Sequence, residues 1–438
     1  MGNLQSFWGQ IDLNSVSQIH SISEGFLDFL KTTKTEWEVK DYIFRKLLHF
    51  RFSDLSKISS ASPGLGFIED LDDGCIAAGV FGTSNIQKRG LSIIGCPIDL
   101  DNVELGPRSP GLIPESDIST VRFSPLNEDV RDEWMSTDVS IHGLRILKDN
   151  SRRSFTLGES RKEPGYFIAP APEKKAAKSK KVKKQYDLVV GSAAPEGKDK
   201  KPHYSEAFLN SIGMTEKELN SATLSLVPAS MPNEMGSDRS LIQGFGAREL
   251  LPVYASLKTL TDLTRPEDTV VVIFHTQKGE CSRKNHNKEI TEKVAESILK
   301  KVVEKVSENA VKDIFEFSRI LNVTDLELKQ SKTSQEVPAK PLPIGKGTII
   351  GTTGGSSRSQ RLLGIIEDSL EKAGIPYVKS PKNYEFHSGG TIGTAFSKSI
   401  PEAVNMARVV SVSRNFCSAV SKIDLWAAYR TILAYSTH

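Results

Sequence analysis

Apolar residues recur along the chain with two periods, and these periods predict alternating helices and strands. Residues 37–50 place Val39, Ile43 and Leu47 on one stripe, which predicts an amphipathic helix. Residues 269–274 form a continuous β-branched run, typical of a strand buried on both faces. The same patterns predict strands within residues 79–98 and at 348–350, 375–378 and 409–412, and helices at 290–311, 360–372 and 422–435.

This alternation of strands and helices indicates an α/β fold with a mostly parallel sheet and helices on both of its faces. Residues 101–236 interrupt the alternation, because they are rich in proline and contain broken, strand-like segments such as 139–146. We therefore predict one α/β domain built from residues 1–100 and 237–438, with a β-rich inserted domain at 101–236.

Charge and cysteine content narrow the class of protein. A net charge of +3 in 438 residues does not favour nucleic acid or a membrane surface as partner. The longest apolar runs fall short of a membrane span, and the N-terminus lacks the pattern of a secretion signal. The four cysteines are widely separated, which is typical of reduced thiols. A soluble, cytoplasmic protein is expected.

The basic residues are concentrated in one tract. Residues 174–184 contain seven lysines, so the rest of the chain has a net charge of about −4. Because no aromatic residues are interleaved with these lysines, a solvated loop is favoured over an anion- or nucleic-acid-binding arm.

Motifs that would identify a reaction are missing from the sequence. No zinc-finger spacing, His-Glu-x-x-His, Walker loop or Gly-x-Ser-x-Gly elbow occurs. A glycine-rich stretch, 351–358, follows a predicted strand and opens a helix. A tight turn with Ser356 or Ser357 as N-cap is favoured there, and an anion site that includes Arg358 is the alternative. A nucleophilic pair of His275 and Cys281 is disfavoured, since no third orienting group is visible.

Four segments, in order along nearly the whole chain, carry a resemblance to a known family. They are residues 26–50, 226–246, 389–392 and 421–435. Together they resemble the aspartyl aminopeptidase and vacuolar aminopeptidase I family of dinuclear zinc exopeptidases. The resemblance implies two zinc ions bridged by an Asp and held by two His and two further acids, with a Glu as general base on the bridging water.

The residues of this chain at those family positions differ from the implied ligands. The first His falls at Pro97, although the Asp that would orient it is kept as Asp99. The bridging Asp falls at Arg248. The general base falls at Gln277, and the neighbouring acidic ligand falls at Lys278. A further acidic ligand aligns with Asn322, and the last His aligns with Arg414 or Ser413. None of these side chains offers the implied carboxylate or imidazole.

Cations at former metal positions would offset the charge of the absent zinc ions. We therefore expect Arg248, Lys278 and Arg414 to be buried in an internal salt-bridge cluster. Their acidic partners would be Asp99, Glu249 and Glu280. On this hypothesis no cofactor is expected, and zinc would bind only if the chain were an active enzyme.

Three functions remain open. The favoured one is a non-catalytic homologue that acts as a structural, assembly or regulatory subunit. The second is an active metal-dependent aminopeptidase that releases N-terminal, acidic residues with a rearranged site. The third is a module that binds an anionic peptide in the emptied pocket.

Relatives of this kind form large closed oligomers, so the expected partner is the chain itself, in a homo-oligomer larger than a dimer, or an active aminopeptidase relative. The inserted domain would make the dimer contacts, through a face that includes Val139 and Ile141.

Overall fold

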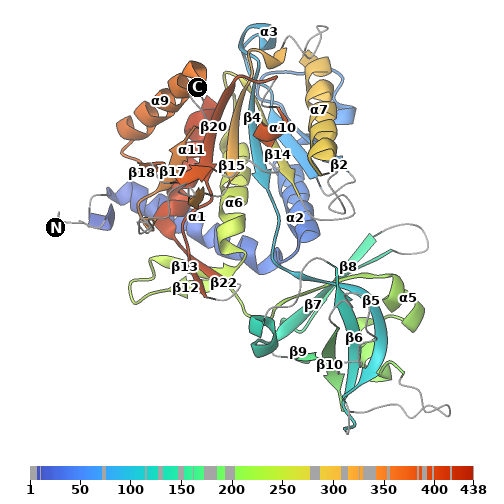
Figure 1. Cartoon of the computed structure of the whole chain (residues 1–438). Coiled ribbons are helices and arrows are strands. Elements are labelled where there is room, and N and C mark those ends of the chain that lie inside the picture. The colour runs from blue at the N-terminus through green and yellow to red at the C-terminus, as the bar shows by residue number, and fades with distance from the viewer. Residues whose placement is uncertain are drawn as a thin grey trace, which may run out of the picture. The chain divides into compact units, whose positions relative to one another are not determined.

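The computed structural model of the chain (Figure 1) describes residues 7–9, 11–71, 75–113, 116–126, 132–146, 152–160, 162–171, 185–192, 203–276, 287–306, 314–324, 326–328, 342–352, 356–381, 384–386, 392–396, 399–414 and 417–437. The chain divides into two compact units, one of residues 1–100 and 232–438 and one of residues 101–231. Residues 232–236, which the sequence placed in the insertion, belong to the first unit because strand β12 (Asn233–Met235) pairs with β13 (Leu241–Phe245).

A nine-stranded sheet forms the centre of the first unit. Its four middle strands, β14, β4, β15 and β20, are all mutually parallel. In spatial order the strands are β1 (Ser53–Asp54), β2 (Gly66–Leu71), β3 (Cys75–Val80), β14 (Thr269–His275), β4 (Leu91–Pro97), β15 (Arg319–Thr324), β20 (Glu402–Ala407), β17 (Thr348–Gly351) and β18 (Tyr377–Lys379). Two small antiparallel sheets accompany it, one of β12, β13, β22 (Cys417–Ser421) and β21 (Val412–Arg414), the other of β16 (Leu326–Leu328) and β19 (Tyr384–Phe386).

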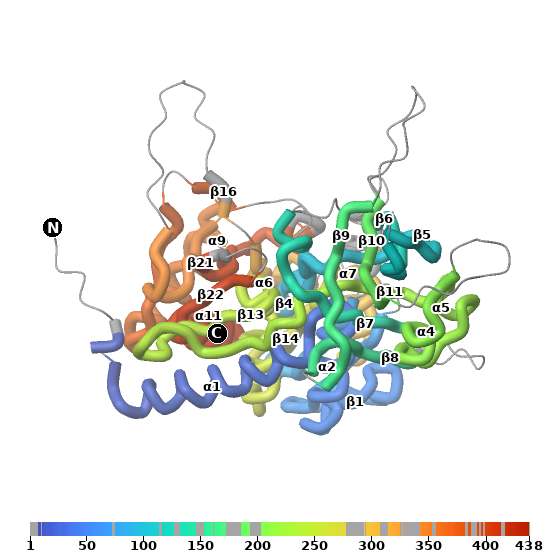
Figure 2. The backbone as a smooth tube through the Cα atoms, turned by 90° about the horizontal axis from the view of Figure 1, so that it is seen from below, coloured from blue at the N-terminus to red at the C-terminus, as the bar shows by residue number. Residues whose placement is uncertain are grey.

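Helices cover both faces of this sheet, as Figures 1 and 2 show. Because side chains alternate along a strand, Ile93 and Val271 point to the face covered by α7, whereas Cys96 and Ser92 point to the face covered by α6 and α11. The helices of this unit are α1 (Leu13–Thr32), α2 (Glu36–His49), α3 (Ile86–Arg89), α6 (Ala247–Asp262), α7 (Asn287–Val306), α9 (Ser357–Lys372), α10 (Ile392–Ala395) and α11 (Lys422–Thr437), with 3-10 turns η1 (Phe7–Gly9) and η2 (Leu55–Lys57). The predicted α/β class is confirmed.

The second unit is built on a seven-stranded antiparallel sheet. Its strands, in spatial order, are β8 (Arg152–Leu157), β7 (Val139–Ile146), β11 (Thr223–Pro228), β5 (Val103–Leu112), β6 (Ser119–Pro125), β10 (Tyr186–Gly191) and β9 (Phe167–Pro170). The short helices η3 (Asp132–Ser136), α4 (Glu206–Ile212) and α5 (Glu216–Ser221) accompany it. Val139 and Ile141 are fully buried within the chain, so the expectation that they offer a free face to another subunit is wrong.

One predicted strand is misplaced. The sequence put a strand at 409–412, whereas the central strand is β20 (Glu402–Ala407) and residues 408–411 lie outside any strand. The β-branched pair Val409-Val410 favoured the later segment. Asn405 lies within the true strand, where its side chain accepts a hydrogen bond from the amide of Asn322 at 3.2 Å, so tertiary pairing outweighs its low strand propensity.

Candidate functional site

The parallel strands bring several of the predicted positions to one edge of the central sheet. Pro97 is the last residue of β4, His275 is the last residue of β14, and the two are paired in register. Asn322 in β15 lies opposite Gly95 of β4. In open α/β sheets, this carboxyl end of the strands is where ligands usually bind. The sheet therefore assembles the positions that the resemblance assigned to a metal site.

Asp99 follows this edge, and its carboxylate is engaged. Its Oδ1 accepts a hydrogen bond from Thr276 Oγ1 at 2.7 Å. The resemblance would have this carboxylate orient an imidazole two residues earlier, but Pro97 has no side-chain donor. Thr276, which comes directly after β14, supplies a hydroxyl to Asp99 instead.

Two groups that are ligands in other proteins lie at the same edge, and both are deeply buried. His275 is 1% exposed, and among the described residues neither ring nitrogen has a hydrogen-bond partner. Burial lowers the pKa of His275 to about 4, with the charge of Asp99 opposing that shift, so the ring is neutral at pH 7. Burial raises the pKa of the Cys96 thiol to about 12, so that thiol stays protonated at pH 7.

Arg248 lies at the start of α6 and differs from the buried cation that the sequence predicted. Its Nε and Nη2 both contact Glu249 Oε1 at 2.9 Å, which agrees with one of the partners proposed for it. However, its side chain is 40% exposed, so the prediction that this cation is buried is wrong. The backbone N–H of Arg248 donates to Ser418 Oγ at 3.0 Å, which fixes the first turn of the helix.

The amide of Asn322 is occupied at both ends. Its Nδ2 donates to Asn405 Oδ1 at 3.2 Å, and its Oδ1 accepts the backbone N–H of Gly393 at 2.7 Å. A Cβ at Gly393 would lie 2.0 Å from Asn322 Nδ2, so this close approach requires glycine. A side chain held in this way binds the start of α10 to the sheet.

Arg408 is a further cation at this edge that the sequence did not single out. It follows β20 directly. Its charge opposes the effect of burial on the pKa of Cys96 and adds to the effect of burial on the pKa of His275. In the sequence, the position of Arg408 directly after the apolar end of β20 could have indicated a cation at this edge. It was missed because β20 itself was placed too late in the sequence.

The remaining predicted residues fall elsewhere or outside the description. Gln277, Lys278, Glu280, Cys281, His387 and the tract 174–184 lie outside the described residues, as do the side chains of Ser413 and Arg414. Ser356 is the N-cap of α9, as predicted, but its side chain makes no capping hydrogen bond. Ser357 begins that helix, and Arg358 lines a cavity at the opposite, amino end of the sheet.

The described residues do not fit a zinc site. Throughout those ranges, no three His, Cys, Asp or Glu side chains gather closely enough to hold a metal ion. A complete ligand set would therefore need donors from the part of the chain beyond the described ranges.

Comparison with known proteins places this geometry in a family. A family model described as aminopeptidase I zinc metalloprotease (M18) matches residues 29–310. A relative from Borrelia garinii, named probable M18 family aminopeptidase 1, is 22% identical over 98% of this chain and 99% of its own length. The crystal structure of aminopeptidase I from Borrelia burgdorferi B31 aligns with a TM-score of 0.77 at 20% identity, over 99% of this chain and 100% of that one. The mApe1 dodecamer of S. cerevisiae aligns with a TM-score of 0.68 at 17% identity, over 95% and 96%.

These comparisons correct one expectation. The prediction that no cofactor is needed is wrong, because the matched family is described as zinc metalloproteases and membership implies zinc. That prediction rested on the residue types at the aligned positions, two of which, Gln277 and Lys278, lie outside the described residues. None of the helices within the described ranges is long and apolar enough to cross a membrane.

Proposed function

This chain belongs to the M18 family of aminopeptidase I zinc metalloproteases, and from that premise we propose that it is a non-catalytic member that serves as a structural or assembly subunit. The observation that carries the proposal is the state of the carboxyl edge of the sheet. Pro97 has no donor there, Asn322 makes two hydrogen bonds, and Arg248, which the resemblance aligns with the bridging Asp, is a partly exposed arginine.

The side chains that remain at this edge are suited to holding the fold rather than to moving protons. Cys96 stays protonated and His275 stays neutral at pH 7, and both lie beneath the surface. A general base needs a pKa near the working pH and access to substrate. Neither side chain has both properties, and the carboxamide of Gln277 at the base position cannot take up a proton at neutral pH.

An active metallo-aminopeptidase is the second candidate, and the relatives favour it. The Borrelia garinii protein named as an aminopeptidase matches almost the full length of this chain. On this alternative, donors would come from residues beyond the described ranges, such as Glu280, His286 and His387. The third reading, a module for anionic peptides at this edge, stays a prediction; the charges of Arg248 and Arg408 are its support.

A peptidase assay on the full chain separates the first two candidates. The purified protein is incubated with zinc, manganese or cobalt and a panel of peptides with acidic and neutral N-terminal residues. The Borrelia garinii relative serves as the reference. We expect no metal-dependent release of an N-terminal residue by this chain, and none by the variant Gln277→Glu, because one repaired group in a cooperating site returns little activity. Metal-dependent release by the wild type would contradict the proposal and establish the second candidate.

The proposed subunit role also requires assembly. We propose a homo-oligomer larger than a dimer, or a mixed oligomer with an active relative, supported by the dodecamer among the aligned structures. The inserted unit is proposed to make the dimer contacts. Its last strand in spatial order, β9, carries Phe167, whose side chain is 48% exposed, and an exposed aromatic ring suits a contact between subunits. Light scattering that gave the mass of a 48.2 kDa monomer at micromolar concentration would contradict this.

A further inference from the structure

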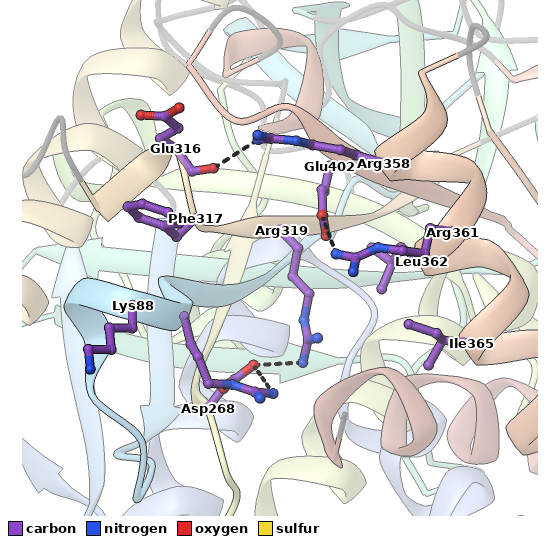
Figure 3. A pocket seen from close by; sticks show the side chains of 11 residues that line it. Lys88, Asp268, Glu316, Phe317, Arg319, Arg358, Arg361, Leu362, Ile365 and Glu402 are labelled. Carbon is purple, nitrogen blue, oxygen red and sulfur yellow. Dashed lines mark hydrogen bonds and ion pairs between the residues drawn. The ribbon is translucent and has the colours of Figure 1, made fainter.

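A cavity of about 450 Å³ lies at the amino end of the central strands, at the opposite sheet edge from the positions that the resemblance assigned to a metal site. Arg89 precedes β4, Asp268 precedes β14, Arg319 begins β15 and Glu402 begins β20, and the first turns of α9 complete the lining (Figure 3). This volume lies within the range of small-molecule sites.

The floor of the cavity is a buried ion-pair network. Asp268 is 3% exposed and receives Arg89 Nε at 2.6 Å and Arg319 Nη2 at 2.9 Å. Arg319 is held from two more sides, because its Nε donates to Ser92 Oγ at 2.9 Å and its guanidinium lies 5.4 Å from the ring centre of Tyr435. The floor is therefore pre-organised, and two guanidinium groups share a single buried carboxylate.

The rim adds positive charge that carboxylates do not neutralise. Among the described residues, neither Lys88 nor Arg358 forms an ion pair; Arg358 Nη1 donates only to the backbone carbonyl of Glu316, at 3.4 Å. The Glu316 carboxylate points away from that guanidinium (Figure 3). Arg361 pairs with Glu402 at 3.2 Å. Five cationic and three acidic side chains line the cavity, and Glu267 beside it pairs with Arg89 at 3.0 Å, so one positive charge remains in excess.

An aromatic surface stands beside these cations. The Phe317 side chain is 51% exposed and lines the cavity, and the partly exposed Ile365 lies on α9. An exposed aromatic ring next to arginine and lysine side chains suits a ligand that has a flat ring and an anionic group.

We propose that this cavity binds a nucleotide, with its phosphates on Arg358 and Lys88 and its base stacked on Phe317. Guanidinium groups bind phosphate oxygens through charge-assisted hydrogen bonds, and residues of the first turns of α9, the positive end of the helix dipole, line the cavity. The proposal is independent of peptide hydrolysis, because none of these residues belongs to the carboxyl edge.

Calorimetry on the full chain tests this with ADP, and with pyrophosphate and adenosine as separate probes. We expect ADP to bind more tightly than either fragment. The variants Arg358→Gln and Lys88→Gln should each weaken ADP binding about tenfold. Phe317→Ser should weaken ADP about tenfold and leave pyrophosphate unchanged.

Matched controls use exposed residues outside the cavity. Lys372→Gln changes the far end of α9, and Phe50→Ser removes another exposed ring; both should leave ADP binding unchanged. No ADP binding at millimolar concentration would overturn the proposal. Wild-type affinity in the Arg358→Gln Lys88→Gln double variant would overturn the location, and insensitivity of ADP to Phe317→Ser would overturn the assignment to a nucleotide.

Discussion

The two edges of the central sheet are built by the same strands but carry opposite chemistry. At the carboxyl edge, β14 ends in His275, which is buried and neutral. In β15, the amide of Asn322 donates one hydrogen bond and accepts another. At the amino edge, β14 is preceded by Asp268 and β15 begins with Arg319, and both charges face a cavity. Within the described residues, the cavity lined by charged side chains therefore lies at the amino edge, away from the positions that the resemblance assigned to a metal site.

Breaking the amino-edge network should have the largest effect on stability. Asp268→Ala leaves Arg319, whose side chain is 12% exposed, without its carboxylate, so we expect a loss of about 3–5 kcal/mol in the free energy of unfolding. Urea denaturation at pH 7.5 measures it. The neighbouring Glu267→Ala is the control, because Glu267 is 52% exposed and its pair with Arg89 should contribute at most about 1 kcal/mol. Equal losses in both variants would show that the network is not a buried one.

The sequence could predict the elements but not this network. The apolar stripe at Val39, Ile43 and Leu47 and the β-branched run of β14 are local signals, and both predicted elements are confirmed. Asp268 and Arg319 lie far apart in sequence and meet only because β14, β4 and β15 are neighbours in the sheet. Local periodicity contains no information about strand order, so neither the cavity nor its charges could be read from it.

Burial of His275 at the carboxyl edge should make the free energy of unfolding depend on pH. The pKa of His275 is about 4 in the folded chain and 6.5 when unperturbed. As the pH falls below 6.5, this histidine therefore takes up its proton in the unfolded state but not yet in the folded state. The stability associated with a neutral His275 is complete above pH 6.5 and is lost progressively as the pH falls to 4, by up to about 3 kcal/mol.

Replacing this histidine should remove that pH dependence. We expect His275→Leu to be at least as stable as the wild type at pH 7.5, because it removes two buried nitrogens that have no hydrogen-bond partner among the described residues. We also expect it to lose less stability between pH 6.5 and 4.5. Urea denaturation at several pH values measures this, with the exposed His49→Leu as control. Parallel pH profiles of His275→Leu and wild type would contradict burial of a neutral imidazole.

The smallest effect is expected at Arg248, where sequence and structure disagree most. Its place at the bridging-metal position predicted a buried cation, whose removal would cost several kcal/mol. The structure instead has a side chain that is 40% exposed and paired with its neighbour Glu249. Exposed pairs contribute little, and the backbone hydrogen bond to Ser418 survives truncation, so Arg248→Ala should cost at most about 1 kcal/mol. Thermal and urea unfolding should give Arg248→Ala about the same loss of stability as Arg45→Ala, which breaks an exposed ion pair on α2. A loss of several kcal/mol at Arg248 alone would restore the buried-cation hypothesis, and buried charges would then stabilise both edges of the sheet rather than the amino edge alone.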